Sequence, residues 1–148
     1  MFAQLDTKSV YSFMDSVVDL NSYVARAKEL GYQALGLMDR DNLYAAYHFA
    51  QLASRNGLRP LIGMEANLFY EGRKIPFRLL AKNNQGYKNL MKLATELSSG
   101  QREFTAFSDY LNAIALILPS EDWEPGMTLG SEVFIGVRPE DAGKEFDY

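Results

Sequence analysis

The sequence contains no cysteine and a single histidine, His48. Without cysteine the chain can form no disulfide, no thiolate zinc site and no cysteine nucleophile. One imidazole cannot build the multi-histidine clusters that zinc, iron or manganese hydrolase sites usually need. His48 also falls in the middle of a predicted helix, where we expect a surface or partly packed side chain rather than a metal ligand. A Ser–His–Asp triad is equally disfavoured, since the serines near the N-terminus are far from His48 in sequence.

Long apolar runs and a basic excess are also lacking. No stretch approaches the roughly 20 apolar residues of a membrane span, and we expect no signal peptide because the N-terminus lacks an apolar core. The net charge is -4 and the isoelectric point is near 5.0, whereas nucleic-acid surfaces usually carry a basic excess. The absence of cysteine fits a reducing compartment, so we expect a cytoplasmic protein. The absence of a long apolar run and of a basic excess predicts that it does not bind a membrane and does not bind DNA strongly by itself.

The sequence does contain alternating helical and strand patterns. Its 148 residues, 47% of them hydrophobic, fit one globular domain. Amphipathic spacing predicts a helix over 19–31 that Asp19 or Asn21 can cap, and a second from Asp41 or Asn42 to about 56. A third is predicted over 85–99, opened by Asn83 and Asn84. Shorter apolar runs predict strands at 32–38, 61–70, 77–81, 113–118 and 133–137, with a hairpin turn at 70–74, a loop at 119–131 and a charged tail at 138–148. Such alternation is typical of a mainly parallel sheet, either a barrel or an open doubly wound sheet.

Polar side chains gather where the predicted strands end, as they do around the crevice of parallel α/β folds. The candidate crevice residues are Gln4, Asp6, Lys8, Asp39, Arg40, Asp41 and Glu65. Three interpretations stay open. Asp39 and Asp41 could cap the helix that follows. Asp6, Asp39 and Glu65 could bind magnesium. Alternatively, Lys8 and Arg40 could pair with the acids and take the electrostatic place of a cation.

Other side chains receive simpler interpretations. We expect the aromatic residues Tyr44, Tyr47 and Phe49 to pack in the interior rather than to form a base-stacking platform. The cations Arg73, Lys74, Arg78 and Lys82 fall on the predicted hairpin, as a local positive patch or as ordinary solvated strand faces.

Four segments, in order, carry a family resemblance: FAQLDTKSVYSFMDS, ELGYQALGLMDRDNLYAAYHF, GLRPLIGMEANL and LLAKNNQGYKNLMKL. Together they resemble the N-terminal PHP (polymerase and histidinol phosphatase) domain of bacterial DNA polymerase III alpha subunits, of the Gram-positive type, over roughly residues 1–98. The resemblance implies that residues 1–148 form an α/β fold, an incomplete or distorted PHP-type, TIM-like β/α barrel with mainly parallel strands. A closed eight-stranded barrel typically takes about 250 residues, so we expect a fragment of a longer protein.

The family motifs can be matched residue by residue. The H-x-H-x-H motif falls on Gln4, Asp6 and Lys8, and the glutamate of the G-x-E segment falls on Glu65. The D-H-G-N-L motif falls on residues 39–43, so that Arg40 replaces its histidine and Asp41 its glycine. Only Asp39 and Glu65 keep a ligand type. The resemblance therefore implies a degenerate metal site with no catalytic residue and no cofactor in this fragment, and we hypothesise that Arg40 pairs with at least one carboxylate.

For the whole protein, the resemblance implies a DNA-directed DNA polymerase, a nucleotidyltransferase of DNA replication with magnesium at its polymerase site. The fragment would be a structural and interaction domain whose partners are the remaining polymerase domains and replisome proteins, and it would self-associate when isolated. The first alternative is a metal-dependent PHP phosphoesterase or 3′–5′ exonuclease that uses Asp6, Asp39 and Glu65. The second is a DNA-binding module, which the charge disfavours.

Overall fold

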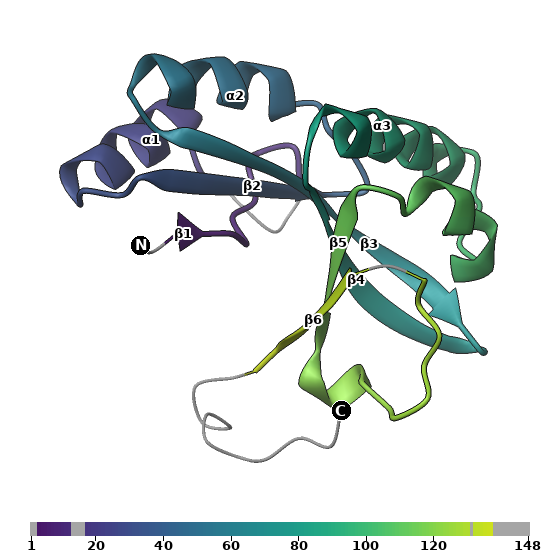
Figure 1. Cartoon of the computed structure of the whole chain (residues 1–148). Helices are drawn as coiled ribbons and strands as arrows, with labels where there is room; N and C mark the ends of the chain where they lie inside the picture. Colours follow the sequence, from purple (N-terminus) through teal and green to yellow (C-terminus); the bar gives the residue numbers. More distant parts are fainter. Residues whose placement is uncertain (1–2, 13–16, 131, 138–148) are drawn as a thin grey trace.

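The computed structural model describes residues 3–12, 17–130 and 132–137. Six strands among these residues form one curled sheet in the order β1 to β6, with helices α1, α2 and α3 on one side of it (Figure 1). The strands are β1 (Ala3–Gln4), β2 (Ala34–Arg40), β3 (Arg59–Tyr70), β4 (Arg73–Ala81), β5 (Ile114–Pro119) and β6 (Glu132–Gly136). The helices are α1 (Leu20–Glu29), α2 (Ala46–Arg55) and α3 (Asn84–Ser98), with 3-10 helices η1 (Phe104–Tyr110) and η2 (Ser120–Asp122).

Strand pairing confirms the predicted fold class. The pairs β1–β2, β2–β3 and β5–β6 are parallel, whereas β3–β4 and β4–β5 are antiparallel. Helices α1 and α2 are the crossovers that parallel neighbours require. The predicted hairpin turn joins β3 to β4 through Glu71 and Gly72, whose φ angles of 50° and 79° are both positive, as the turns favoured in tight hairpins need. The described part of the chain is thus an incomplete β/α barrel with β1 and β6 at its open edges.

Two of the three helices begin where the sequence predicts. Asp19 caps α1 by accepting a hydrogen bond from the Ser22 amide (2.9 Å), and Asn83 caps α3 by accepting one from the Gly86 amide (3.0 Å). The prediction for α2 was wrong, because this helix begins at Ala46 and its cap position has no side-chain hydrogen bond. Asp41 has a φ of 58°, a left-handed conformation that a right-handed helix cannot include.

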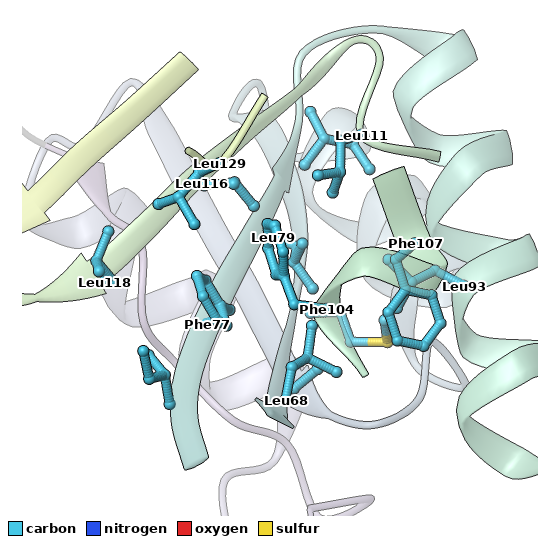
Figure 2. Close-up of a cluster of buried hydrophobic side chains, with 14 of the residues drawn as sticks. Leu68, Phe77, Leu79, Leu93, Phe104, Phe107, Leu111, Leu116, Leu118 and Leu129 are labelled. Atoms are coloured by element: carbon cyan, nitrogen blue, oxygen red, sulfur yellow. The ribbon is translucent and has the colours of Figure 1, made fainter. Parts of the chain in front are cut away.

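The interior consists of two hydrophobic clusters. The smaller one lies under α1 and α2 and contains Val24, Leu35, Leu37 and Phe49. The larger one lies between the β3–β4–β5 part of the sheet and α3 with η1. Its members labelled in Figure 2 are Leu68, Phe77, Leu79, Leu93, Phe104, Phe107, Leu111, Leu116, Leu118 and Leu129. Leu129 shows that the predicted loop 119–131 also contributes to the core, and η2 lies in the same loop. The predicted tail, residues 138–148, lies outside the described residues.

None of the helices in the described ranges is long and apolar enough to cross a membrane.

The start of α3 sits directly on the backbone that leads into β5. A Cβ atom on Gly86 would lie 2.2 Å from the Ala113 carbonyl oxygen, which also accepts a hydrogen bond from the Lys82 amide. No rotamer change can relieve a clash with backbone. The position therefore requires glycine for reasons of space.

We expect Gly86→Ala to lower the free energy of unfolding by about 3 kcal/mol, the upper end of the usual cost of overpacking. Urea titration followed by circular dichroism measures this loss. Lys88→Ala, an exposed position on the same helix, is the control and should change stability by less than about 0.5 kcal/mol. A Gly86→Ala protein as stable as the wild type would contradict the close approach.

Candidate functional site

Strand register places three charged side chains in one row. Arg40 on β2 lies beside Glu65 on β3, and Glu65 lies opposite Arg78 on β4. Residues paired in register point to the same face of a sheet, so these side chains converge on the inner surface of the incomplete barrel. The hairpin between β3 and β4 is what brings Arg78 into the row.

The segment after β1 adds two more charges. Lys8 Nζ lies 2.9 Å from Asp6 Oδ1 and 3.1 Å from Glu65 Oε2. Arg40 Nε and Nη2 lie 3.0 and 2.9 Å from Glu65 Oε1, and Arg78 Nε donates to Asp6 Oδ2 at 2.8 Å. We call these five residues, Asp6, Lys8, Arg40, Glu65 and Arg78, the ion-pair cluster. The hypothesised pairing of Arg40 with a carboxylate is present.

Because the Glu65 carboxylate is buried, its contacts with Lys8 and Arg40 are needed to offset its loss of hydration. The Glu65 side chain is 5% exposed, and a carboxylate at such a position is strongly destabilising unless it is paired and hydrogen-bonded. Lys8 and Arg40 supply that pairing on its two oxygens. The Arg40 side chain is 41% exposed, so its guanidinium keeps part of its hydration while it neutralises Glu65. The cluster thus combines two carboxylates with three side-chain cations.

The neighbouring charges of the cluster change the pKa of Asp6. Burial raises the pKa of Asp6, but the hydrogen bond and charge of Lys8, together with the charge of Arg78, lower it by more. The pKa of Asp6 therefore lies below its ordinary value of 3.8, and the carboxyl is ionised at neutral pH.

Asp39 has a different role from the one that helix capping predicts. Its side chain accepts hydrogen bonds from the Ser9 amide (2.6 Å), the Ser9 hydroxyl (2.7 Å) and the Ser12 hydroxyl (2.7 Å). Asp39 is almost completely buried, so these three donors replace its lost hydration. Because the bonds run to the segment after β1 and not to α2, Asp39 fixes the stretch of chain that carries Asp6 and Lys8.

Asp41 does not cap α2 either. Its two carboxylate oxygens accept hydrogen bonds from Arg102 Nη1 (2.8 Å) and Nη2 (2.9 Å), a bidentate geometry with strong directional preference. The resemblance places the glycine of the family motif at this position. The φ of Asp41 is 58°, and aspartate is among the few residues other than glycine that tolerate such a left-handed conformation. The ion pair then links the end of β2 to the segment after α3.

The structure brings some predicted residues together and leaves others apart. Asp6, Lys8, Arg40 and Glu65 meet in the cluster, whereas Gln4 is exposed on β1 and no contact found among the described residues joins it to them. Sequence reasoning missed the four side chains that partner the predicted acids, Ser9, Ser12, Arg78 and Arg102. Arg78 could have been found by counting outward from the hairpin turn, because Tyr70 pairs with Arg73 and hence Glu65 with Arg78.

The hairpin cations do not form a free positive patch. Arg73 binds Glu124, Arg78 binds Asp6, and Lys82 binds Glu132. A metal site built from Asp6, Asp39 and Glu65 is not assembled, because within the described ranges no three His, Cys, Asp or Glu side chains are grouped to hold a metal ion. Lys8 and Arg40 already contact the two Glu65 oxygens, and Asp39 accepts from Ser9 and Ser12, so these acids in their present contacts do not fit a divalent cation.

Comparisons with known proteins agree on the family. The model of the PHP domain family matches residues 4–124. The DNA polymerase III subunit alpha of Streptococcus pyogenes serotype M1 is 47% identical over 137 residues, which are 93% of this chain and 13% of that protein. The Bacillus subtilis (strain 168) protein of the same name is 33% identical over 126 residues, 81% of this chain and 11% of that protein. The chain therefore spans only a small part of the length of the relatives that it matches.

A solved structure shares the fold. A proposed metal-dependent phosphoesterase from Bifidobacterium adolescentis superposes with a TM-score of 0.52 and 16% sequence identity, covering 64% of this chain and 32% of that chain. The similarity supports the incomplete barrel.

The lowered pKa of Asp6 predicts an acid-dependent loss of stability. The group contributes stability above its ordinary pKa of 3.8, and this contribution disappears as the pH falls through the lowered pKa of the folded state. Asp6→Asn cannot titrate, so its unfolding free energy should depend less on pH in this acidic range. Urea titrations at several acidic pH values measure the slope. Lys8→Met, which removes a cause of the shift, should flatten the same slope; unchanged slopes in both variants would contradict the assignment.

Replacing Arg40 tests the buried carboxylate. We expect Arg40→Met to lower the unfolding free energy by about 1–2 kcal/mol, below the 3–5 kcal/mol of a fully buried pair because Arg40 is partly exposed and Lys8 remains. The matched control is Arg26→Met, which breaks the exposed Arg26–Glu29 pair of 3.0 Å and should cost less than about 0.5 kcal/mol. Equal effects of the two substitutions, measured by urea titration, would show that burial adds nothing at Glu65.

Proposed function

The chain belongs to the PHP domain family, and we propose that it is a structural and interaction domain of a DNA polymerase III alpha subunit whose ion-pair cluster has taken the place of a metal site. The observation that carries the proposal is the contact of Lys8 and Arg40 with the buried Glu65 carboxylate, at 2.9 to 3.1 Å. Side-chain cations thus contact the carboxylate oxygens that a metal ion would need as ligands.

Simple electrostatics supports this role. Two unit charges 4 Å apart interact by about 4 kcal/mol at an effective dielectric constant near 20, so a divalent ion beside one of these cations would be repelled by about 8 kcal/mol. The ion would also have to displace existing hydrogen bonds on Asp6 and Glu65. Asp39 is committed to Ser9 and Ser12 and would lose three donors if it turned toward a metal.

The polymerase assignment rests on similarity over nearly the whole chain. In this proposal, DNA-directed nucleotide addition, with its magnesium, belongs to parts of the longer polypeptide that this chain does not include. The domain contributes a rigid scaffold and contact surfaces for the other polymerase domains and for replisome proteins, in the cytoplasm. The isolated chain would self-associate through its open edge, since β6 exposes Phe134, which is 50% exposed.

A cleavage assay and a metal analysis test the loss of metal chemistry. We expect the purified chain to retain no stoichiometric manganese, magnesium, iron or zinc after gel filtration. It should release no product from single-stranded DNA, primer–template DNA or a phosphomonoester, with or without added Mn²⁺, because cations already neutralise the carboxylates. Elemental analysis and product release are the measurements.

The alternative functions give distinct results in the same experiment. A PHP phosphoesterase or exonuclease would show a tightly held metal and cleavage that a chelator abolishes and that Asp39→Ala, Asp6→Ala or Glu65→Ala removes. A DNA-binding module would show binding to duplex or primer–template DNA that weakens steeply with salt. Either result would contradict the proposed structural role of the domain.

A further inference from the structure

The hairpin between β3 and β4 has a consequence on the outer side of the sheet. Parallel neighbours are joined by crossover helices, and α2 is the crossover that leads into β3. The tight turn after Tyr70 provides no helix between β3 and β4, and the next helix, α3, follows β4 (Figure 1). Helices α2 and α3 are therefore neighbours on the outer side of the sheet, and α3 already buries outward side chains of β3 such as Met64 and Leu68.

Two hollows border α3 on this side of the molecule. One has a volume of about 340 Å³ and is lined by Tyr47 and Ala50 of α2, Ile62 of β3, Ala81 of β4 and Tyr87 of α3. The other has a volume of about 290 Å³ and is lined by residues that include Leu43, Tyr44, Tyr87, Met91 and Ala94. Tyr87 lines both, so the two hollows lie next to each other along α3. We call them together the α2–α3 groove.

Large side chains are exposed along the groove. Tyr44 is 75% exposed, Tyr47 is 68% exposed and Met91 is 43% exposed. The prediction that Tyr44 and Tyr47 pack in the interior was therefore wrong, and of the three aromatics considered there only Phe49 is buried. Tyrosine and methionine are enriched in protein interfaces, and clustered exposed apolar groups commonly mark docking surfaces.

The shape of the groove fits an elongated occupant. The α3 residues that line it repeat at helical spacing, at positions 84, 87, 91, 94, 95 and 98, so one face of the helix borders the groove along its length. A helix that lies in such a groove would present apolar side chains at matching spacing.

The charge around the groove selects an acidic occupant. Exposed Arg59 lines the first hollow, and exposed Lys88 lies one residue from Tyr87 on α3, whereas Lys82, which also lines the first hollow, is already paired with Glu132. The sequences of α2 and α3 contain three cations and one acid, Glu96, although the whole chain has a net charge of -4. Asp41, which lines the second hollow, is already neutralised by Arg102. A partner segment with carboxylates beside its apolar face is complementary to this surface.

We propose that the α2–α3 groove is the docking site of an acidic amphipathic helix contributed by another part of the same, longer polypeptide. The inference rests on the proposed function, in which this chain is one domain of a polymerase subunit. The chain corresponds to 13% of the length of its Streptococcus relative, so a large amount of tethered protein surrounds such a domain. Tethering raises the effective concentration of a segment to about the millimolar range, where even a weak groove is occupied.

Site-specific photo-crosslinking in the full-length polymerase subunit tests the proposal. Tyr47→p-benzoylphenylalanine places the reactive ketone in the groove, and Leu30→p-benzoylphenylalanine, which is 53% exposed just after α1, is the matched control. After irradiation of dilute purified protein, peptide mass spectrometry should find an intrachain crosslink from position 47 to a helical segment rich in Asp or Glu. The control should not crosslink to that segment. A crosslink to a second copy, a crosslink to a non-acidic segment, or no crosslink above the control would overturn the proposal.

A charge reversal gives a second measurement. The double substitution Arg59→Glu and Lys88→Glu should reduce the crosslink from position 47 severalfold, because Arg59 lines the groove and exposed Lys88 lies beside it on α3. Arg26→Glu with Lys28→Glu, on the exposed surface of α1, is the control and should leave the yield unchanged. An unchanged yield in the Arg59 and Lys88 variant would overturn the acidic character of the occupant. These results are independent of the metal and cleavage assays, which concern the opposite face of the sheet, so the two proposals can fail separately.

Discussion

The buried carboxylate of Glu65 is the constraint on which the site depends. It lies in the middle of β3 with almost no access to water, and ionised groups at such positions need paired charges and well-directed hydrogen bonds. Arg40 and Lys8 meet this need from the neighbouring strand and from the segment after β1. The register of β2 against β3 and the path of residues 5–12 are therefore coupled to the burial of one acidic side chain.

The acids of the site divide into two functions that their residue types alone do not reveal. Asp6 and Glu65 belong to the ion-pair cluster, whereas Asp39 fixes the backbone that carries Asp6 and Lys8 by binding Ser9 and Ser12. The hydrogen bond from the Met38 amide to the Thr7 carbonyl (2.8 Å) reinforces the same attachment.

The β3–β4 hairpin affects both faces of the sheet. On the inner face, the antiparallel register places Arg78 opposite Glu65 and within hydrogen-bonding distance of Asp6. On the outer face, the same connection omits a crossover helix and leaves the α2–α3 groove with its exposed tyrosines. One local feature, a turn with two positive φ angles, therefore shapes the charge of the crevice and the surface available for docking.

The sequence by itself determined the local elements and the family. Hydrophobic spacing, the caps Asp19 and Asn83 and the turn at Glu71 and Gly72 act over a few residues, so they could be recognised without a structure. Tertiary structure decided the partners of the charges, because Arg102 meets Asp41 and Arg78 meets Asp6 across more than sixty residues of chain. It also decided that Tyr44 and Tyr47 face solvent, since the exposure of a side chain depends on which elements pack against it in the folded chain.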